Sequence, residues 1–328
     1  MGERVLTIEN LRLSFPVYQG EVSVLNDISM HINAGEIVGV VGESGSGKSV
    51  TAMLSMRLIP QSIYKIHSGR IDLLGTDILQ ASEASMTNIR GNKVAMIFQE
   101  PMTALNPTRR IGKQMMDVIR KHRHLNKQES RERAIELLND MQISDPATIM
   151  NSYPFELSGG MRQRVMIALA FSCNPDLLIA DEPTTALDVT VQRQVLRLLK
   201  QKAKSTGTAV LFISHDMAVV SQVCDRLYVM YAGSVIESGN TRKVLSTPYH
   251  PYSTGLLRCS PEGCEPGTKL TSIPGTVPNL SKLPSGCSFR ERCFAASDAC
   301  QNVPKLRQTM DNERQIACWN PQQEHPYV

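Results

Sequence analysis

The chain of 328 residues has few aromatic residues and no long hydrophobic segment. Its longest apolar runs, such as residues 37–41 and 209–213, are far shorter than the roughly 20 residues that a membrane-spanning helix needs. The N-terminal ten residues include charged side chains and have no apolar core, so we expect no secretory signal. The sequence therefore predicts a cytosolic protein, and if it works at a membrane, other chains must supply the spanning helices.

The sequence also has little net charge. Its 35 lysines and arginines nearly balance 31 aspartates and glutamates, which gives a formal net charge of +4. This balance indicates neither a nucleic-acid-binding surface nor a surface for anionic membranes. We therefore expect no nucleic-acid partner.

Eight cysteines are present, and six of them lie between residues 259 and 318. In a secreted protein they would suggest disulfide bonds. A chain without a secretory signal is instead expected to meet reducing conditions, where thiols stay free or bind metal. Cys173 and Cys224 lie among apolar residues, so we expect both in the core.

The pattern of apolar residues predicts an α/β domain followed by a different C-terminal segment. Short β-branched runs alternate with helical segments over residues 5–238, which is typical of helices around a mostly parallel sheet. Helical periodicity alone continues over residues 109–173, so we expect an all-helical insert there. After residue 239 the chain becomes rich in proline, glycine, serine and cysteine, which predicts a loop-rich tail. The expected strands are residues 36–41, 94–98, 177–181, 209–214 and 226–231.

Residues 42–49, Gly-Glu-Ser-Gly-Ser-Gly-Lys-Ser, fit the phosphate-binding pattern GxxxxGK[ST] in full. An apolar strand precedes the motif and a helical run, residues 50–58, follows it; the alternative is a chance glycine-rich loop before a helix. The glycines let backbone N–H groups point at phosphates, while Lys48 is expected to reach the β- and γ-oxygens and Ser49 to ligate Mg²⁺. The expected nucleotide-binding residues of this segment are Gly42, Glu43, Ser44, Gly45, Ser46, Gly47, Lys48, Ser49 and Val50.

Two carboxylates end the expected strand at residues 177–181, at the edge where open α/β sheets bind ligands. Asp181 is expected to hold Mg²⁺, and Glu182 to orient or deprotonate the attacking water. His215, which follows another expected strand, is a candidate contact to the γ-phosphate and that water. Alone, the acidic pair would be read as a helix cap and the histidine as an ordinary surface residue.

A second glycine-containing motif, Leu-Ser-Gly-Gly-Met at residues 157–161, opens a helix about 20 residues before the acidic strand. The Ser158 side chain and the backbone amides of Gly159 and Gly160 would form another anion site at a helix N-terminus. The motif resembles the signature of ABC ATPases, although Met161 replaces the glutamine that is commonest there.

The resemblance to ABC ATPases spans residues 5–239 and implies a RecA-like phosphate-loop core, an antiparallel β subdomain and the helical insert, here about residues 100–175. It implies that the signature of one chain closes on the nucleotide of a second ATPase subunit, so that each complete site needs two chains. Gln99 then becomes a catalytic residue and Mg²⁺ ligand, Asp188 the D-loop residue, and His215 the switch histidine. Phe15, or alternatively Tyr18, is expected to stack on adenine.

Three tail segments, residues 250–257, 273–280 and 286–293, resemble the C-terminal extension of dipeptide and oligopeptide importer ATPases. The resemblance implies an ATPase cassette over residues 1–246 and an extension over residues 247–328. It also implies two membrane permeases, a substrate-binding protein, a paralogous second ATPase and a place at the cytoplasmic face of the inner membrane. Within the family the subgroup importing D-alanyl-D-alanine dipeptides is favoured, and a nickel or other small-solute importer is the alternative.

Four tail cysteines, Cys287, Cys293, Cys300 and Cys318, are candidate metal ligands. Their spacing lacks the short CxxC pairs of a zinc finger, whereas a [4Fe–4S] cluster tolerates it. Peptide-importer ATPases with this extension resemble cluster carriers, so we expect an iron–sulfur cluster with a structural role. A zinc site and four free thiols remain the alternatives.

Two other classes of function are open to a sequence of this kind. An ABC protein that acts on DNA or ribosomes would be expected to carry a second cassette, a long coiled coil or a basic arm, and the sequence has none of these. A regulatory adaptor with a degenerate ATPase site would be expected to lack Lys48 or Glu182, and both are present.

Overall fold

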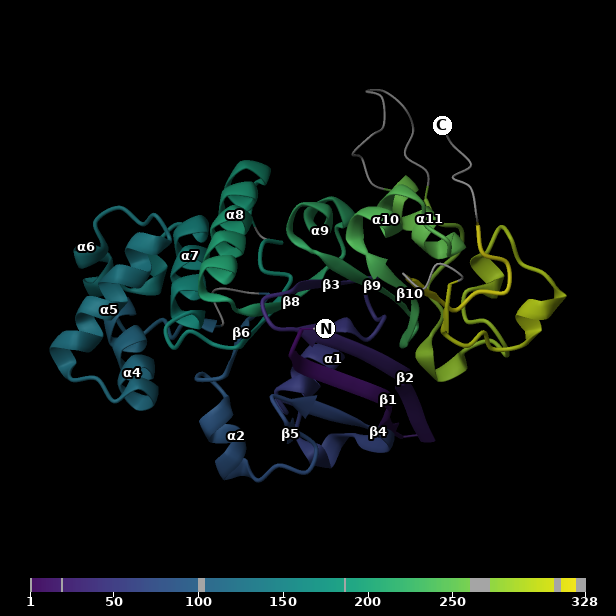
Figure 1. Cartoon of the computed structure of the whole chain (residues 1–328), viewed down its shortest axis with the longest axis horizontal. Helices are drawn as coiled ribbons and strands as arrows, with labels where there is room; N and C mark the ends of the chain where they lie inside the picture. The colour runs from purple at the N-terminus through teal and green to yellow at the C-terminus, as the bar shows by residue number, and fades with distance from the viewer. Residues whose placement is uncertain are drawn as a thin grey trace. The chain divides into compact units, whose positions relative to one another are not determined.

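The computed structural model describes residues 2–18, 20–99, 104–185, 187–259, 272–309 and 314–322 (Figure 1). The chain divides into two compact units. The first, called the helical unit, comprises Met1–Val5, Asn33–Glu36 and Gln80–Leu211. The second, called the sheet unit, comprises Leu6–Ile32, Ile37–Leu79 and Phe212–Val328.

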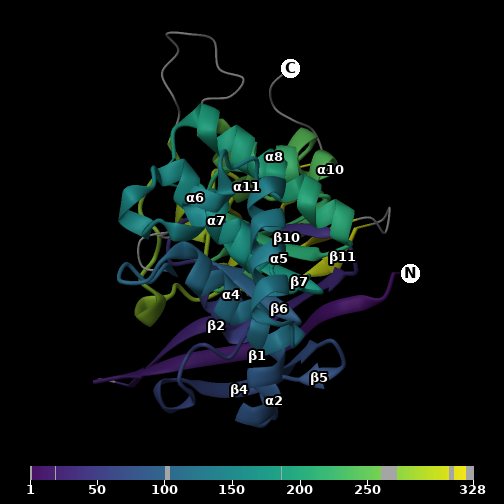
Figure 2. The ribbon, with the colours of Figure 1, turned by 90° about the vertical axis from the view of Figure 1, so that its left-hand side faces the viewer.

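The helical unit contains the expected insert as a group of packed helices (Figures 1 and 2). α4 packs against α5, both contact α6 and α7, and α8 packs against α7. A parallel pair of strands, β6 and β7, belongs to the same unit. The bounds are α2 (Glu83–Ile89), β6 (Val94–Ile97), α4 (Ile111–Arg123), α5 (Lys127–Asp140), α6 (Pro146–Asn151), η2 (Pro154–Glu156), α7 (Gly159–Ala170), β7 (Leu177–Asp181) and α8 (Val189–Thr206).

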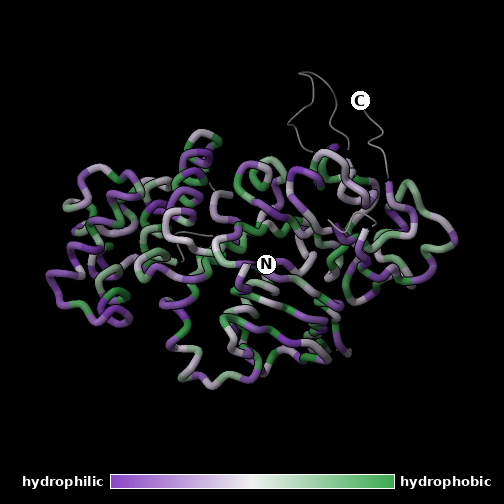
Figure 3. Tube along the Cα trace, viewed as in Figure 1, coloured by the Kyte–Doolittle hydropathy of each residue, from purple (hydrophilic) through white to green (hydrophobic). Residues whose placement is uncertain are grey.

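Local sequence explains where α5 begins and which face it buries. The Asn126 side chain accepts a hydrogen bond from the backbone N–H of Glu129 at 3.0 Å, and the Glu129 carboxylate accepts from the backbone N–H of Asn126 at 2.7 Å. This reciprocal capping box satisfies donors that a helix start otherwise leaves unpaired. Ala134, Leu137 and Leu138 form the buried face of α5. Hydrophobic and hydrophilic residues alternate in the same way along much of the trace (Figure 3).

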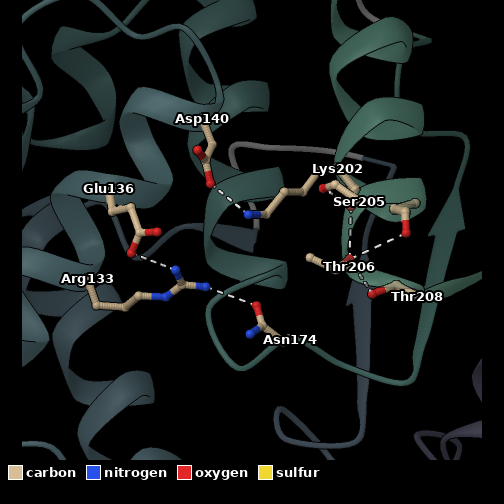
Figure 4. Close-up of polar contacts among 9 residues, drawn as sticks. Arg133, Glu136, Asp140, Asn174, Lys202, Ser205, Thr206 and Thr208 are labelled. Carbon is tan, nitrogen blue, oxygen red and sulfur yellow. Dashed lines mark hydrogen bonds and ion pairs between the residues drawn. The ribbon is translucent and has the colours of Figure 1, made fainter.

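Polar contacts tie α5 to its neighbours within the helical unit (Figure 4). Lys202 on α8 pairs with Asp140 at the end of α5, with a distance of 2.6 Å from Nζ to Oδ2. Arg133 bridges Glu136 on its own helix, at 2.6 Å, and the Asn174 side chain, at 2.9 Å. These contacts fix the packing of α5 beyond what its apolar face provides.

The sheet unit contains an antiparallel sheet with strand order β2-β1-β4-β5. β1 pairs with β4 in a register that matches Leu6 with Leu73, and the register shifts between Glu9 and Arg12, where the strand is irregular. The expected antiparallel β subdomain is thereby confirmed. The bounds are β1 (Arg4–Val17), β2 (Gly20–Asn33), β4 (Lys65–Leu73) and β5 (Thr76–Asp77).

A mixed sheet forms the rest of this unit's core. β3 pairs with β9 in parallel, whereas β9 with β10, β10 with β12, and β12 with β11 pair antiparallel. All five residues of β3 are buried, as expected of an interior parallel strand. The bounds are β3 (Ile37–Val41), β8 (Ala209–Ser214), β9 (Arg226–Tyr231), β10 (Ser234–Asn240), β11 (Arg307–Gln308) and β12 (Arg314–Ile316).

Short helices complete the sheet unit, including its C-terminal part. Pro251 begins α11, where a residue without a backbone N–H costs no helical hydrogen bond. The bounds are α1 (Lys48–Ser55), η1 (Gln61–Ile63), α9 (Met217–Val223), α10 (Thr241–Ser246), α11 (Pro251–Arg258), η3 (Leu280–Lys282), η4 (Arg290–Arg292) and η5 (Asp298–Gln301). Across the described ranges, no helix combines the length and the apolar character that crossing a membrane requires.

Candidate functional site

The loop at residues 42–49 connects β3 to α1 in the sheet unit. Gly42, Gly45 and Gly47 have positive φ angles of 152°, 80° and 97°, which other residues rarely adopt. A Cβ added at Gly42 would overlap the carbonyl oxygen of Met230, and one added at Gly47 would lie 2.8 Å from a methyl carbon of Leu25. Gly42 and Gly47 are thus required by both conformation and space, and Gly45 by conformation alone.

The Lys48 ammonium group lies inside the curl of this loop. Its Nζ donates to the carbonyl oxygens of Gly42 and Glu43, at 2.8 and 2.9 Å, and to the hydroxyl of Ser46 at 3.4 Å. The side chain is buried, although it opens α1 beside the half-buried Ser49. A phosphate oxygen is a stronger acceptor than a carbonyl oxygen, so this ammonium group is suited to an anionic ligand held by the loop.

Glu182 follows β7 in the helical unit and is held by two donors. The Gln99 side-chain amide donates to its Oε2 at 3.1 Å, and the Thr185 hydroxyl donates to the same oxygen at 3.1 Å. The structure thus brings together two of the expected catalytic residues, Gln99 and Glu182, beside Asp181 at the buried end of the strand. Thr185 is a further member of this site that the sequence does not predict, because nothing in the local pattern marks it as a carboxylate partner.

The backbone of Glu182 is in the left-handed region, with a φ of 47°. This conformation costs an L-residue with a side chain roughly 1–3 kcal/mol, and such residues are concentrated at functional sites. Because this φ is far from the extended values of a strand, the Glu182 side chain does not continue the alternating directions of β7.

The signature motif forms the start of α7. The Ser158 hydroxyl caps the helix by accepting from the backbone N–H of Met161 at 3.3 Å, and Gly159 and Gly160 occupy the first two helical positions. A Cβ added at Gly160 would lie 2.7 Å from Val191, so that position requires glycine. Beside them is a cavity of about 210 Å³, lined by Gln142, Ile143, Ser144, Ser158, Gly160, Met161, Arg164 and Val191.

Asp188 caps α8 by accepting from the backbone N–H of Val191 at 3.0 Å. The expected D-loop residue therefore has a structural role at a helix start as well. His215 lies exposed between β8 and α9 in the sheet unit, the unit that contains the phosphate loop, whereas Asp181 and Glu182 belong to the helical unit.

The two candidate adenine-stacking residues differ in exposure. Phe15 lies near the end of β1 and is half-buried, whereas Tyr18 follows the strand and is fully exposed. Both belong to the sheet unit, and the choice between them stays a prediction.

None of the four candidate tail ligands forms a disulfide bond. Cys300 is buried, and Cys287, Cys293 and Cys318 are half-buried. Burial, followed by the electrostatic effect of the other three thiols, raises the pKa of Cys318 to about 12. Burial and neighbouring thiols also raise the pKa values of Cys287 and Cys293. In the part of the chain that the structure describes, however, no three His, Cys, Asp or Glu side chains are placed to hold one metal ion. The expected iron–sulfur site therefore gains no support from this geometry.

The chain is similar to ABC transporter ATPases in sequence and in fold. The family model described as ABC transporter matches residues 25–185. The solved dimeric structure of the ATP-binding cassette MJ0796, bound to ADP and phosphate, is 27% identical with a TM-score of 0.64, and the match covers 72% of this chain and 99% of that one. The cbiO1 structure from Clostridium perfringens is 26% identical with a TM-score of 0.63, over 74% and 91% of the two chains. Fold and motifs are those of an ABC ATPase.

The particular family follows from the C-terminal region and from curated relatives. The model described as Oligopeptide/dipeptide transporter, C-terminal region, matches residues 236–300. The chain is 65% identical to the "Probable D,D-dipeptide transport ATP-binding protein DdpD" of Escherichia coli, over 99% of each chain. It is 43% identical to the oligopeptide transport ATP-binding protein OppD of the same organism, over 98% of this chain and 95% of that protein. The chain belongs to the ATP-binding subunits of the oligopeptide and dipeptide ABC transporters, and the predicted ATPase class is confirmed.

Proposed function

We propose that the chain hydrolyses ATP with the residues of its phosphate loop, its acidic strand end and its signature motif in defined roles. The loop at residues 42–49 binds the phosphates, with Lys48 on the β- and γ-oxygens. Ser49, Gln99 and Asp181 would be the residues that hold Mg²⁺, which would screen the phosphate charge. Glu182 orients or deprotonates the attacking water. The observation that carries this proposal is the Glu182 side chain, which belongs to a residue of positive φ and accepts hydrogen bonds from Gln99 and Thr185, because these contacts hold a carboxylate in place at the end of β7.

Glu182→Gln tests this assignment. The change keeps the size and the hydrogen-bonding capacity of the side chain but removes its basicity. We expect ATP to bind with unchanged affinity and turnover to fall by roughly 10²–10⁴-fold, the range supplied by general base catalysis. Thr185→Val is the matched control, since it removes one donor to the carboxylate without removing the carboxylate. Turnover by Glu182→Gln at the wild-type rate would contradict the role.

A complete site requires a second ATPase subunit. The signature residues Ser158, Gly159, Gly160 and Met161 would contact the nucleotide of the partner, and Asp188 would lie at the contact between the subunits. Support comes from the helix N-terminus and small cavity at the signature, and from the dimer formed by the related cassette MJ0796. We propose a paralogous partner, two permeases and a substrate-binding protein acting with them. Native mass spectrometry of the transporter purified from its source distinguishes a mixed pair from two identical chains.

The transported substrate is proposed to be a D,D-dipeptide such as D-alanyl-D-alanine. The 65% identity to the D,D-dipeptide transport protein over nearly the whole chain supports this class over longer peptides. The cassette, residues 1–246, would then act at the cytoplasmic face of the inner membrane, with residues 247–328 as its extension. Uptake of labelled D-alanyl-D-alanine by cells with and without the chain tests the substrate, and ATP-dependent uptake of nickel instead would overturn it.

The tail is proposed to bind a [4Fe–4S] cluster through Cys287, Cys293, Cys300 and Cys318. Support comes from the number and type of donors in the sequence, since four cysteine thiolates can hold such a cluster. Bound to four thiolates, the cluster would cross-link a segment that has few aromatic residues and a small core. Anaerobic purification with iron, sulfide and zinc analysis tests this. Four iron and four sulfide per chain are expected, whereas zinc or no metal would withdraw the cluster and leave the ATPase assignment intact.

A further inference from the structure

One residue of the phosphate loop is held by the C-terminal part of the chain. The Glu43 carboxylate accepts two hydrogen bonds from the Arg292 guanidinium, from Nη1 to Oε2 at 2.7 Å and from Nη2 to Oε1 at 3.1 Å. The two residues lie 249 positions apart in the sequence but in the same sheet unit. A bidentate pair of this kind fixes orientation as well as distance.

Arg292 is itself fixed by its surroundings. Its side chain is 6% exposed, its Nε donates to the carbonyl oxygen of Pro274 at 2.9 Å, and its Nη1 also reaches the hydroxyl of Tyr231 at 3.4 Å. The guanidinium carbon lies 5.8 Å from the centre of the Tyr231 ring and 5.9 Å from that of Phe289. With these contacts the guanidinium has little freedom to leave the loop.

The backbone of Glu43 is held from the same side. Its N–H donates to the hydroxyl of Tyr252 at 2.8 Å, and the Tyr252 side chain is fully buried on α11. The rings of Tyr252, Tyr231 and Phe289 lie 4.7–5.3 Å from one another in edge-to-face contacts. Both the side chain and the main chain of this loop residue are therefore anchored in one rigid aromatic cluster.

The carbonyl oxygen of Glu43, like that of Gly42, accepts a hydrogen bond from Lys48. A shift of Glu43 would move the ammonium group that is suited to phosphate. In addition, an unpaired carboxylate on the loop would repel the phosphates of a nucleotide, because like charges at close range raise the energy of the complex. The Arg292 guanidinium counters that charge through its two hydrogen bonds to the carboxylate.

We propose that Arg292 is a positioning residue for nucleotide binding: through its paired contact with Glu43, the C-terminal extension holds the phosphate loop in its binding shape and neutralises the loop's own carboxylate. The inference rests on the proposed role of residues 42–49 in phosphate binding. It predicts that Arg292 sets nucleotide affinity, and that its effect requires the carboxylate of Glu43.

The test measures binding of a fluorescent ATP analogue and steady-state ATPase kinetics on the full chain with its partners. Arg292→Ala is expected to weaken binding roughly tenfold or more and to raise KM, with kcat at saturating ATP nearly unchanged, because truncating one partner leaves the other charge unpaired. Adding Glu43→Gln to Arg292→Ala should restore the part of the affinity that was lost through the unpaired carboxylate. Arg292→Lys should fall between. Arg290→Ala, which removes a cation from the same short helix η4, should change neither quantity more than twofold.

Two results would overturn the inference. One is wild-type affinity in Arg292→Ala. The other is weak binding that Glu43→Gln does not relieve, since a purely structural anchor would be lost equally in both variants. Lys48→Ala separates this inference from the function on which it rests: unchanged nucleotide affinity in Lys48→Ala would refute phosphate binding by the loop itself.

Discussion

His250 is expected to make the C-terminal part of the chain sensitive to acid. Its side chain is 2% exposed, and its Nδ1 caps α11 by accepting from the backbone N–H of Tyr252 at 3.0 Å. Because Nδ1 is an acceptor, the ring is neutral in the folded protein. Burial lowers the pKa of His250 from 6.5 to about 3. The buried carboxylate beside it, Glu237, accepts from the backbone N–H groups of Tyr249 and His250, and burial raises its pKa.

The sign of the effect follows from proton uptake. Below pH 6.5 the unfolded chain binds a proton at this histidine and the folded chain does not, so the free energy of unfolding falls as the pH falls towards 3. The slope approaches about 1.4 kcal/mol per pH unit, and the loss between pH 7 and pH 5 is about 2 kcal/mol. The raised pKa of Glu237 acts in the opposite direction, because protonation at low pH favours the folded state.

The matched variant is His250→Asn, which keeps a side-chain acceptor at the helix cap but does not titrate. Urea unfolding at pH 7 and pH 5, followed by the fluorescence of Trp319, the single tryptophan, gives the free energy for each protein. Glu237 is present in both, so its contribution cancels in the comparison. We expect wild type to lose about 2 kcal/mol more than His250→Asn over this pH range. Equal losses would refute a neutral, buried His250.

Three further changes test other parts of the structure. Gly42→Ala, which places a methyl group against the Met230 carbonyl oxygen at a φ of 152°, should abolish nucleotide binding while the rest of the chain stays folded, as circular dichroism and ATP titration would show. Ser158→Ala should lower the free energy of unfolding by about 1 kcal/mol, because the helix cap is lost. Its ATPase rate should fall as well, because the same hydroxyl is proposed to contact the nucleotide of the partner subunit. Lys202→Ala, which breaks the 2.6 Å pair with Asp140, should lower the free energy of unfolding by about 1 kcal/mol or less in denaturant titration and leave ATP affinity unchanged.

Local motifs were sufficient to predict the elements in which short-range spacing fixes conformation. The glycines at positions 42 and 47 are predicted by the phosphate pattern, and they adopt the positive φ angles that the pattern requires. The expected strands at residues 177–181, 209–214 and 226–231 coincide with β7, β8 and β9, since each is an almost wholly apolar run, which predicts a strand whichever face of the sheet its residues take.

Other features depend on contacts between distant residues and leave no local pattern. The expected strands omit β1 and β2, whose polar and apolar residues alternate irregularly around a register shift; only the family resemblance implied that subdomain. The pairing of Arg292 with Glu43 joins two ordinary charged residues 249 positions apart. The left-handed backbone of Glu182 is equally invisible in the sequence, because it is imposed by the turn after β7.

Coupling between the extension and the phosphate loop must act in both directions. If Arg292 sets the affinity of the loop for nucleotide, then bound nucleotide must stabilise the Arg292 contact by the same free energy. A nucleotide at 100 times its Kd stabilises the binding-competent state by about 2.7 kcal/mol.

Trp319, whose indole N–H donates to the carbonyl oxygen of Asn302 at 2.9 Å, reports on the unfolding of the C-terminal extension. ATP should therefore raise the urea midpoint of the Trp319 signal in wild type. ATP concentrations are adjusted so that every variant is equally saturated, which leaves the connection to the extension as the only difference. The ATP-induced rise of the midpoint should then be smaller in Arg292→Ala than in wild type, and unchanged in Arg290→Ala. A rise of the same size in Arg292→Ala would mean that nucleotide stabilises the extension through contacts other than this pair.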